Sequence, residues 1–231
     1  MIPGFILIFL VAATNWLAVA KGWKTVEYIA KPVTMILLFG WLAFVGGFGS
    51  VPLVCFGLGI FFSLIGDVFL MFSFYRFPDR WFVPGLAAFL LAHVAYIVGL
   101  NNPLPQVAPL WSMGLALILA LATAWVLRRI VTGIRQKGLP RLVAPVVVYG
   151  MVITIMLLSA LLTLYRNDWT TSAPGLVGAG AILFYSSDVV LAWNKFVTPI
   201  KNGRLLNMIL YHLGQFALMA GIMLQFQKVL G

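Results

Sequence analysis

Residues 52–72 read PLVCFGLGIFFSLIGDVFLMF, and residues 174–194 read PGLVGAGAILFYSSDVVLAWN. Each stretch is long enough to cross the roughly 30 Å hydrocarbon core of a bilayer as an α-helix. Each also contains one acidic residue, Asp67 in the first and Asp188 in the second. An ionised carboxylate near the bilayer centre costs about 2.5–3.5 kcal/mol even on a lenient scale, and a purely structural helix gains nothing from it. The pair therefore predicts a site that handles protons, cations or a reactive lipid group.

The rest of the composition indicates a membrane protein throughout. Of the 231 residues, 63% are hydrophobic and 9% are charged, so we predict one membrane domain covering residues 1–231. Only five residues are acidic, and Glu27, Asp79 and Asp168 are expected in polar connections. The net charge of +10 comes from basic residues spread over short connections, which favours membrane topology over a nucleic-acid partner.

Apolar runs separated by polar residues, proline or glycine predict an all-α, polytopic bundle of eight transmembrane helices. The expected spans are residues 3–20, 32–47, 52–72, 83–100, 109–130, 142–165, 174–194 and 204–227. The first span resembles a signal peptide, but no Lys or Arg precedes it, so we interpret it as a true span.

Lysine and arginine fall almost entirely on one side of this topology. The connections after odd-numbered spans hold thirteen of them: Lys21, Lys24, Lys31, Arg76, Arg80, Arg128, Arg129, Arg135, Lys137, Arg141, Lys195, Lys201 and Arg204. The other side holds Arg166 and Lys228. Because cytoplasmic loops carry the excess of basic residues, both termini are predicted to lie outside the cytoplasm. We expect an integral protein of a bacterial inner membrane.

This orientation gives the two aspartates the same depth. Asp67 lies nine residues before Arg76 and Asp188 seven before Lys195, so both are expected roughly 10 Å below the cytoplasmic boundary. Gly59 and Ser63 precede Asp67 at intervals of four, and small residues on one face direct that face into the bundle. We therefore predict that both carboxylates are interior and that they share a cavity in the cytoplasmic half.

A weak internal duplication is consistent with this pairing. Aligning the stretch around Asp67 with the stretch around Asp188 also superimposes two glycines of each. The preceding spans contain AKPV at residues 30–33 and VAPV at residues 143–146. Two parallel four-helix repeats related by an axis along the membrane normal would explain the pattern, and chance similarity between apolar helices is the alternative.

Nine further polar side chains are candidates for supporting or substrate-binding roles. They are Lys31, Ser63, His93, Tyr96, Tyr149, Ser187, His212, Gln215 and Asn15. The alternative for each is a polar contact that packs helix against helix. Lys31-Pro32 predicts a helix N-terminus that receives a phosphate headgroup, and a lysine that reaches the membrane surface is the other interpretation. Histidine and carboxylate residues lack metal-ligand spacing, so we expect no metal and no cofactor.

Several motifs together resemble one family of membrane proteins. They are KPVTM at 31–35, FSLIGD at 62–67 with LM at 70–71, Gly85-x-x-x-Phe89-Leu90-x-Ala92-His93-x-x-Tyr96, Pro145-x-x-x-Tyr149, Gly180-Ala181-x-Leu183-Phe184-x-x-Ser187-Asp188-x-x-Leu191-Ala192 and Tyr211-His212-x-x-Gln215. In order and spacing they resemble the YhhN-like lysoplasmalogenase family over nearly the whole chain, with Val33 where leucine is usual.

The resemblance implies eight helices and an enzyme that hydrolyses the vinyl ether bond of lysoplasmalogens. The substrate would be a lysophospholipid taken from the bilayer, and the products a fatty aldehyde and glycerophospho-ethanolamine or -choline. The family's paired acidic residues correspond to Asp67 and Asp188. The resemblance leaves the natural substrate open, and it does not distinguish a monomer from a homodimer.

Two neighbouring carboxylates suit this reaction. Protonation of the alkenyl β-carbon leaves an oxocarbenium ion, water attacks the carbon that bears the ether oxygen, and the hemiacetal collapses. The enzyme needs a protonated acid together with a negative charge close to the cation, as glycoside hydrolases do. The sequence does not assign which aspartate is the acid. His93, Tyr149 or Gln215 are candidates for orienting them.

Three other functions remain as alternatives. A proton-coupled transporter would use the same aspartates, although most prolines lie near predicted helix ends and not in broken mid-membrane segments. An intramembrane aspartyl protease would require glycine where Leu64 stands and a Tyr-Asp pair at Asp188, and both are missing. A membrane scaffold would tolerate the loss of both aspartates.

Overall fold

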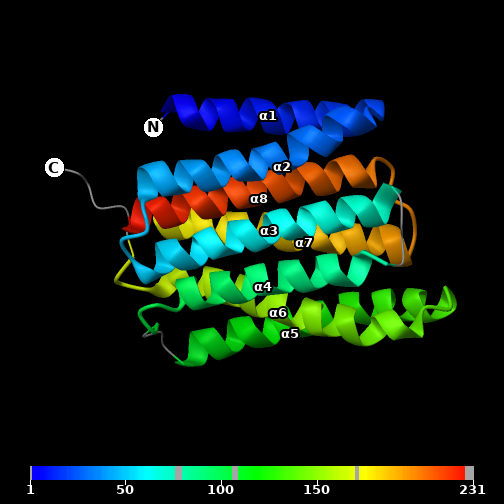
Figure 1. Ribbon diagram of the computed structural model, residues 1–231. Helices are drawn as coiled ribbons and strands as arrows, with labels where there is room; N and C mark the ends of the chain where they lie inside the picture. Colours follow the sequence, from blue (N-terminus) through cyan, green and yellow to red (C-terminus); the bar gives the residue numbers. More distant parts are fainter. Residues whose placement is uncertain (1, 76–79, 106–108, 170–171, 227–231) are drawn as a thin grey trace. The chain divides into compact units, whose positions relative to one another are not determined.

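The computed structural model describes residues 2–75, 80–105, 109–169 and 172–226, and all regular structure in these ranges is helical (Figure 1). The α-helices are α1 (Ile2–Lys21), α2 (Lys24–Trp41), α3 (Val51–Tyr75), α4 (Phe82–Leu100), α5 (Pro109–Gln136), α6 (Val143–Leu162), α7 (Ala173–Phe196) and α8 (Gly203–Phe226). Within the described ranges, eight helices are long and apolar enough to cross a membrane. The chain is an integral membrane protein, as its composition predicts.

Short irregular helices extend two of these spans. A π-helical turn, η1 (Leu42–Gly46), continues α2, and the 3₁₀ turns η2 (Pro140–Leu142) and η3 (Thr163–Tyr165) flank α6. The predictions that concern Arg76, Asp79, residue 227 and Lys228 lie outside the described residues.

The start of α2 differs from the prediction. The helix begins at Lys24 and not at residue 32, so Pro32 lies inside it. The preceding turn explains why: Gly22 adopts a left-handed φ of 71°, and the Trp23 N–H donates to the Ala18 carbonyl at 2.8 Å. This glycine-capped end reverses the chain within two residues, so α2 follows α1 almost immediately. Pro32 therefore lies within a continuous helix and does not mark its beginning.

The end of α5 also differs from the prediction, because the helix continues past residue 130 to Gln136. Its last turns carry Arg128, Arg129 and Arg135, and basic side chains interact favourably with the C-terminal end of a helix. Gly138, with φ 69°, ends the helix in the same way as Gly22 ends α1, with the Leu139 N–H donating to Ile134. The other predicted spans agree with the observed helices to within three residues.

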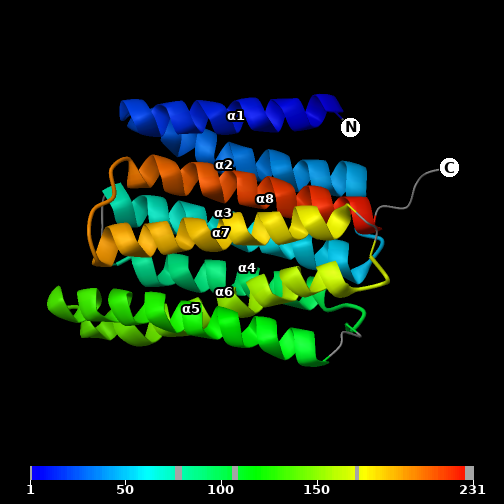
Figure 2. The same ribbon diagram turned by 180° about the vertical axis from the view of Figure 1, so that it is seen from behind.

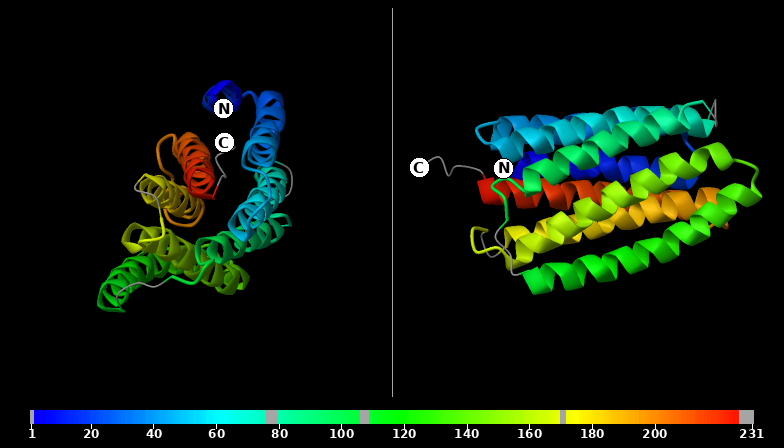
Figure 3. Two further views of the ribbon diagram at one scale, coloured as in Figure 1. Left: turned by 90° about the vertical axis from the view of Figure 1, so that its left-hand side faces the viewer. Right: turned by 90° about the horizontal axis from the view of Figure 1, so that it is seen from below.

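The described residues fall into two compact units, drawn from residues 1–99 with 222–231 and from residues 100–221. In the first unit, α1, α2, α3 and α4 lie side by side in chain order (Figure 3). In the second unit, α5, α6 and α7 contact one another (Figure 2). Most of α8, Gly203–Gly221, belongs to the second unit, and its last turn belongs to the first. The single membrane domain and the duplicated repeats stay predictions.

Glycines set the packing of α3 on α4 in the first unit. A Cβ atom at Gly59 would overlap the ring of Tyr96, and one at Gly66 would come within 2.6 Å of the Phe89 ring. Because these two rings occupy the space of missing side chains, the helices approach closely. The same face of α3 carries Asp67, which is 2% exposed, so the prediction that this face points into the protein is confirmed.

In the second unit, glycines bring backbone against backbone. A Cβ atom at Gly180 of α7 would lie 2.6 Å from the Leu218 nitrogen and 2.8 Å from the Gly214 oxygen of α8. Neither atom can move without moving its helix, so the position requires glycine. A hydroxyl cluster adds to the packing of the other three helices, because Thr123 of α5 lies 2.9 Å from both Thr154 of α6 and Tyr185 of α7.

Candidate active site

Asp67 forms a buried ion pair that connects α3 to α2. Its Oδ1 lies 2.9 Å from the Nζ of Lys31, and the two side chains are 2% and 6% exposed. A carboxylate in an apolar interior requires a counter-charge, and an ammonium group on the neighbouring helix provides one. The prediction that Lys31 lies at a helix N-terminus is wrong, because α2 begins about two turns earlier, at Lys24. Its ammonium is buried beside Asp67 and does not extend to the protein surface, and its role in binding a substrate stays a prediction.

Glu27 is a second buried carboxylate, and its predicted place is wrong. It lies in the first turn of α2 and is 3% exposed, whereas a polar connection was expected. Glu27 precedes Lys31 by four residues, and this spacing puts both on one face of the helix. The Glu-x-x-x-Lys spacing was the available signal, and it was obscured by the late helix start inferred from Pro32.

Asp188 has a different partner, the phenol of Tyr149. Tyr149 of α6 donates to Asp188 Oδ2 at 2.5 Å, and the ring is 8% exposed. Ser187 Oγ donates to the Phe184 carbonyl at 2.7 Å and lies 3.4 Å from Asp188 Oδ1. Asp188 itself is half-buried. Tyr149 was one of three candidates for orienting the aspartates; its contact with Asp188 connects α6 to α7, and its role stays a prediction.

Asn207 is a further residue near this aspartate, and the sequence motifs did not single it out. It lies on α8, is 5% exposed, and its Nδ2 donates to the Ser187 carbonyl at 2.7 Å. This bond fixes α8 to the turn of α7 that carries Asp188. The signal available from sequence was an asparagine five residues before His212 in an otherwise apolar helix.

The two histidines lie in the interior of their units. His93 and Tyr96 on α4 are fully buried, as are His212 and Gln215 on α8. The ring of His212 lies parallel to that of Phe216, with centroids 6.2 Å apart. These positions agree with the predicted interior faces of α4 and α8, and the roles of the four residues stay predictions.

Asn15 of α1 is fully buried. Within residues 2–75, 80–105, 109–169 and 172–226, neither its Oδ1 nor its Nδ2 has a hydrogen-bond partner. A buried amide that makes no hydrogen bond lowers the stability of the folded state by about 1–3 kcal/mol, so Asn15 destabilises the protein at this position.

The candidate residues separate between the two units. The first unit holds Asn15, Lys31, Ser63, Asp67, His93 and Tyr96, and the second holds Tyr149, Ser187, Asp188, His212 and Gln215. Each aspartate lies eight residues before the end of its helix, about 12 Å at 1.5 Å per residue. The two aspartates thus have matching positions within their helices, whereas their depth in the membrane and the shared cavity stay predictions. In the described part of the chain, no cluster of three His, Cys, Asp or Glu side chains could hold a metal ion.

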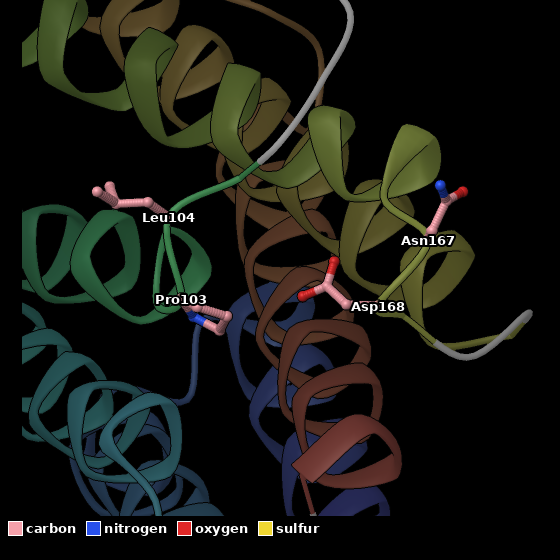
Figure 4. A pocket seen from close by; sticks show the side chains of 4 residues that line it. All are labelled: Pro103, Leu104, Asn167 and Asp168. Atoms are coloured by element: carbon pink, nitrogen blue, oxygen red, sulfur yellow. The ribbon is translucent and has the colours of Figure 1, made fainter.

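A second polar cluster lies outside the spans of the second unit. Arg166 donates to both oxygens of Asp168 at 3.0 and 2.6 Å and to the carbonyls of Leu100 and Pro103 at 2.8 and 3.0 Å. The hydrogen bonds and charge of Arg166 hold the pKa of Asp168 below its usual value. Beside them, Pro103, Leu104, Asn167 and Asp168 line a cavity of about 320 Å³ (Figure 4). Arg166 thus uses four of its five guanidinium N–H groups to join two connections.

Comparison with protein families matches residues 26–222 to the YhhN family. The chain belongs to the YhhN family. The match begins in the first turn of α2 and includes both aspartates and their partners Lys31 and Tyr149. It does not include α1, and therefore leaves out Asn15.

The chain is also similar to proteins that are named lysoplasmalogenases. The chain is 32% identical over 154 residues to lysoplasmalogenase TMEM86B of Homo sapiens, covering 66% of this chain and 56% of that protein. It is 29% identical over 208 residues to lysoplasmalogenase TMEM86B of Mus musculus, covering 88% of this chain and 77% of that protein. The chain thus spans little more than half the length of the human relative. No solved structure matches this chain.

Proposed function

We propose that this protein is a lysoplasmalogenase-type hydrolase. It cleaves the vinyl ether bond of lysoplasmalogens to a fatty aldehyde and glycerophospho-ethanolamine or -choline, by acid–base chemistry of Asp67 and Asp188. The names of its relatives support the substrate class. The observation that carries the mechanism is the difference between the partners of the two intramembrane carboxylates, an ammonium group for Asp67 and a phenol for Asp188.

These partners divide the roles that the sequence left unassigned. Protonation of Asp67 would leave the buried Lys31 ammonium without this counter-charge, and loss of one member of a buried ion pair costs about 3–5 kcal/mol. Asp188 is half-buried and accepts a hydrogen bond from the neutral phenol of Tyr149. We therefore assign Asp188 as the general acid and Asp67 as the carboxylate that is ionised in the resting enzyme.

The proton transfers balance over one cycle. Asp188 gives its proton to the alkenyl β-carbon, and the Asp67 carboxylate stabilises the oxocarbenium ion. Asp67 then takes a proton from the water that adds to the carbon bearing the ether oxygen. In the collapse of the hemiacetal, Asp67 returns that proton to the departing glycerol oxygen and Asp188 takes the hydroxyl proton. Both groups regain their starting states, provided that both reach one substrate, as their matched depth predicts.

Aldehyde release from a purified lysoplasmenyl lipid tests this function. The detergent-purified protein is expected to release one aldehyde per lipid consumed, and a saturated alkyl-ether lysolipid serves as the matched substrate control that cannot react. Absence of release from a folded sample would refute the vinyl ether substrate.

We also propose that the protein lies in a bacterial inner membrane with both termini outside the cytoplasm and the aspartates in the cytoplasmic half. Lys31 is buried in α2 and no longer counts toward the charge asymmetry, but the other basic residues of that side support the orientation. A reporter fused after Gly231 that is active only in the cytoplasm would refute it.

Proton-coupled transport is the second candidate, and one observation favours it. Pro32 lies inside α2 directly after Lys31, so the argument from proline at helix ends does not hold for this helix. Proline or glycine within a membrane-spanning segment near a binding site is typical of transporters. Uptake into proteoliposomes that depends on a pH gradient, in a protein that releases no aldehyde, would support transport over hydrolysis.

A further inference from the structure

Helices α5 and α7 of the second unit end side by side, on the left of Figure 2. A Cβ atom at Gly133 of α5 would overlap the carbonyl oxygen of Phe196 on α7, so the two backbones are in contact there. Just beyond, Nζ of Lys137 donates to the Lys195 carbonyl at 2.6 Å. These contacts fix the end of α5, and the start of the connection that follows it, against the last turn of α7.

These two neighbouring segments are strongly basic. The connection after α7 folds back on that helix, because the Ile200 N–H donates to Asn194 Oδ1 at 2.9 Å. Residues 128–141 contain five Lys or Arg and residues 195–204 contain three, whereas neither segment contains Asp or Glu. Six of these eight basic residues are exposed and two are half-buried. The eight side chains form a basic surface whose charge is not balanced within the two segments.

The last turns of α5 direct arginine away from the protein. Ile130 and Ile134 are buried, on the side of the helix where Gly133 meets α7. Arg128 and Arg135 lie seven residues apart, about two turns, so they share a different face, and both are exposed. The arginine face of α5 is therefore accessible to a partner outside the protein.

Two tryptophans indicate which partner this surface meets. The rings of Trp125 and Trp193 stack with their centroids 6.2 Å apart. Trp125 is 58% exposed, and the guanidinium carbon of Arg129 lies 5.9 Å from the centroid of its ring. Tryptophan is enriched where hydrocarbon meets headgroups, and Arg128 and Arg129 follow Trp125 within about one turn. The guanidinium groups are therefore expected at headgroup level, which favours a lipid phosphate over a soluble anion such as a nucleic acid.

We propose that the basic surface binds anionic phospholipids through their headgroup phosphates. An arginine guanidinium offers parallel N–H donors to phosphate oxygens, and basic clusters beside a transmembrane helix bind anionic lipids. A zwitterionic headgroup brings its own cation close to the phosphate, and the basic surface repels that cation. The occupant is therefore a lipid of net negative charge, and not the zwitterionic lysolipid of the proposed function. The bound headgroups bridge the ends of α5 and α7.

The test compares the dissociation constants of fluorescently labelled phosphatidylglycerol and phosphatidylcholine in detergent micelles that contain the full-length protein. Each basic residue at an anionic membrane surface strengthens binding about fivefold. We expect the wild type to bind phosphatidylglycerol at least about 10-fold more tightly at low ionic strength. In the triple variant Arg128→Gln/Arg129→Gln/Arg135→Gln the preference should fall below about threefold. Lys137 stays unchanged in this variant, because its contact with Lys195 holds the two segments together.

A matched control separates the basic surface from the general excess of positive charge. The variant Lys21→Gln/Lys24→Gln/Arg80→Gln removes the same number of charges from exposed side chains of the first unit. It should keep the wild-type preference for phosphatidylglycerol. In the wild type, the preference should also weaken toward about 1 M salt, where charges are screened over roughly 3 Å.

Three outcomes would overturn the proposal. Equal binding of the two lipids by the wild type would do so without any variant, even if the triple variant does not fold. Equal losses in the two triple variants would show an effect of net charge alone. Displacement of phosphatidylglycerol by inorganic phosphate at constant ionic strength would identify a site for a soluble anion instead. None of these measurements uses turnover, so they test the basic surface whether or not the protein releases aldehyde.

Discussion

Helices α3 and α7 carry their aspartates at matching positions, but the two carboxylates have different hydrogen-bonding partners. In both α3 and α7 an aspartate lies eight residues before the helix end, on a helix packed through glycine. Asp67 is buried against the Lys31 ammonium, whereas Asp188 is half-buried against the Tyr149 phenol. In the sequence alignment of the two halves, alanine stands where Lys31 would be repeated.

The difference teaches that matched positions do not imply matched charge. An ammonium group beside a buried carboxylate favours the ionised form of that carboxylate, because protonation removes the counter-charge of the ammonium. The proposed cleavage of a vinyl ether needs one proton donor and one carboxylate that is ionised in the resting enzyme, and the proposed function assigns these roles to Asp188 and Asp67.

The largest expected effect is on turnover. Asp67→Asn and Asp188→Asn should each reduce aldehyde release by about 10²-fold or more, because each removes one half of the acid–base pair. The measurement is kcat for a lysoplasmenyl lipid. Asp168→Asn is the matched control, since it makes the same chemical change outside the spans, and it should leave turnover unchanged. Near-normal turnover in either of the first two variants would remove that aspartate from the mechanism.

The second effect sharpens the comparison through stability. Lys31→Met should destabilise the protein by about 3–5 kcal/mol because Asp67 loses its buried counter-charge. The double variant Lys31→Met/Asp67→Asn should recover most of this loss, because it removes both charges of the pair. Thermal or denaturant unfolding in detergent measures both, with Asp67→Asn alone closing the double-mutant cycle. Additive losses would contradict a stabilising pair.

The third effect concerns the partner of Asp188. Tyr149→Phe removes the hydroxyl but keeps the ring, so it should lower kcat about 10-fold and stability by about 1–2 kcal/mol, the range for one hydrogen bond to a charged or polar group. Unfolding in detergent, compared with Lys31→Met under the same conditions, measures the loss of stability. A loss as large as that of Lys31→Met would mean that the two aspartates have energetically equivalent partners, and the contrast between them would fail.

Much of this could be predicted from sequence, and the omissions have physical causes. Hydropathy located the eight spans because each must be apolar over its whole length. The Lys31–Asp67 contact was missed because Pro32 was interpreted as a helix start, which placed Lys31 in a connection. Only a helix that begins at Lys24 brings Glu27 and Lys31 into the interior. Tyr149 was named as a candidate through the Pro145-x-x-x-Tyr149 motif, but its pairing with Asp188 depends on the packing of α6 on α7.

The smallest effect lies outside the spans. Because hydrogen bonds from Arg166 lower the pKa of Asp168, the pair stabilises the folded state above the unfolded pKa of about 3.9 and loses this contribution as pH falls through the folded value. The difference in melting temperature between wild type and Asp168→Asn should therefore be constant from about pH 7 to pH 5 and shrink below about pH 4. The effect is small because the carboxylate is half exposed. A difference that grows on acidification would contradict it.

The protonation states of the two aspartates test the central claim most directly. Infrared difference spectroscopy of the purified protein near neutral pH distinguishes the carbonyl band of a protonated carboxylic acid from the bands of a carboxylate. We predict a protonated-acid band that disappears in Asp188→Asn and persists in Asp67→Asn. A band that instead disappears in Asp67→Asn, or that is absent from the wild type, would contradict the assignment of Asp188 as the acid and Asp67 as the carboxylate that is ionised in the resting enzyme.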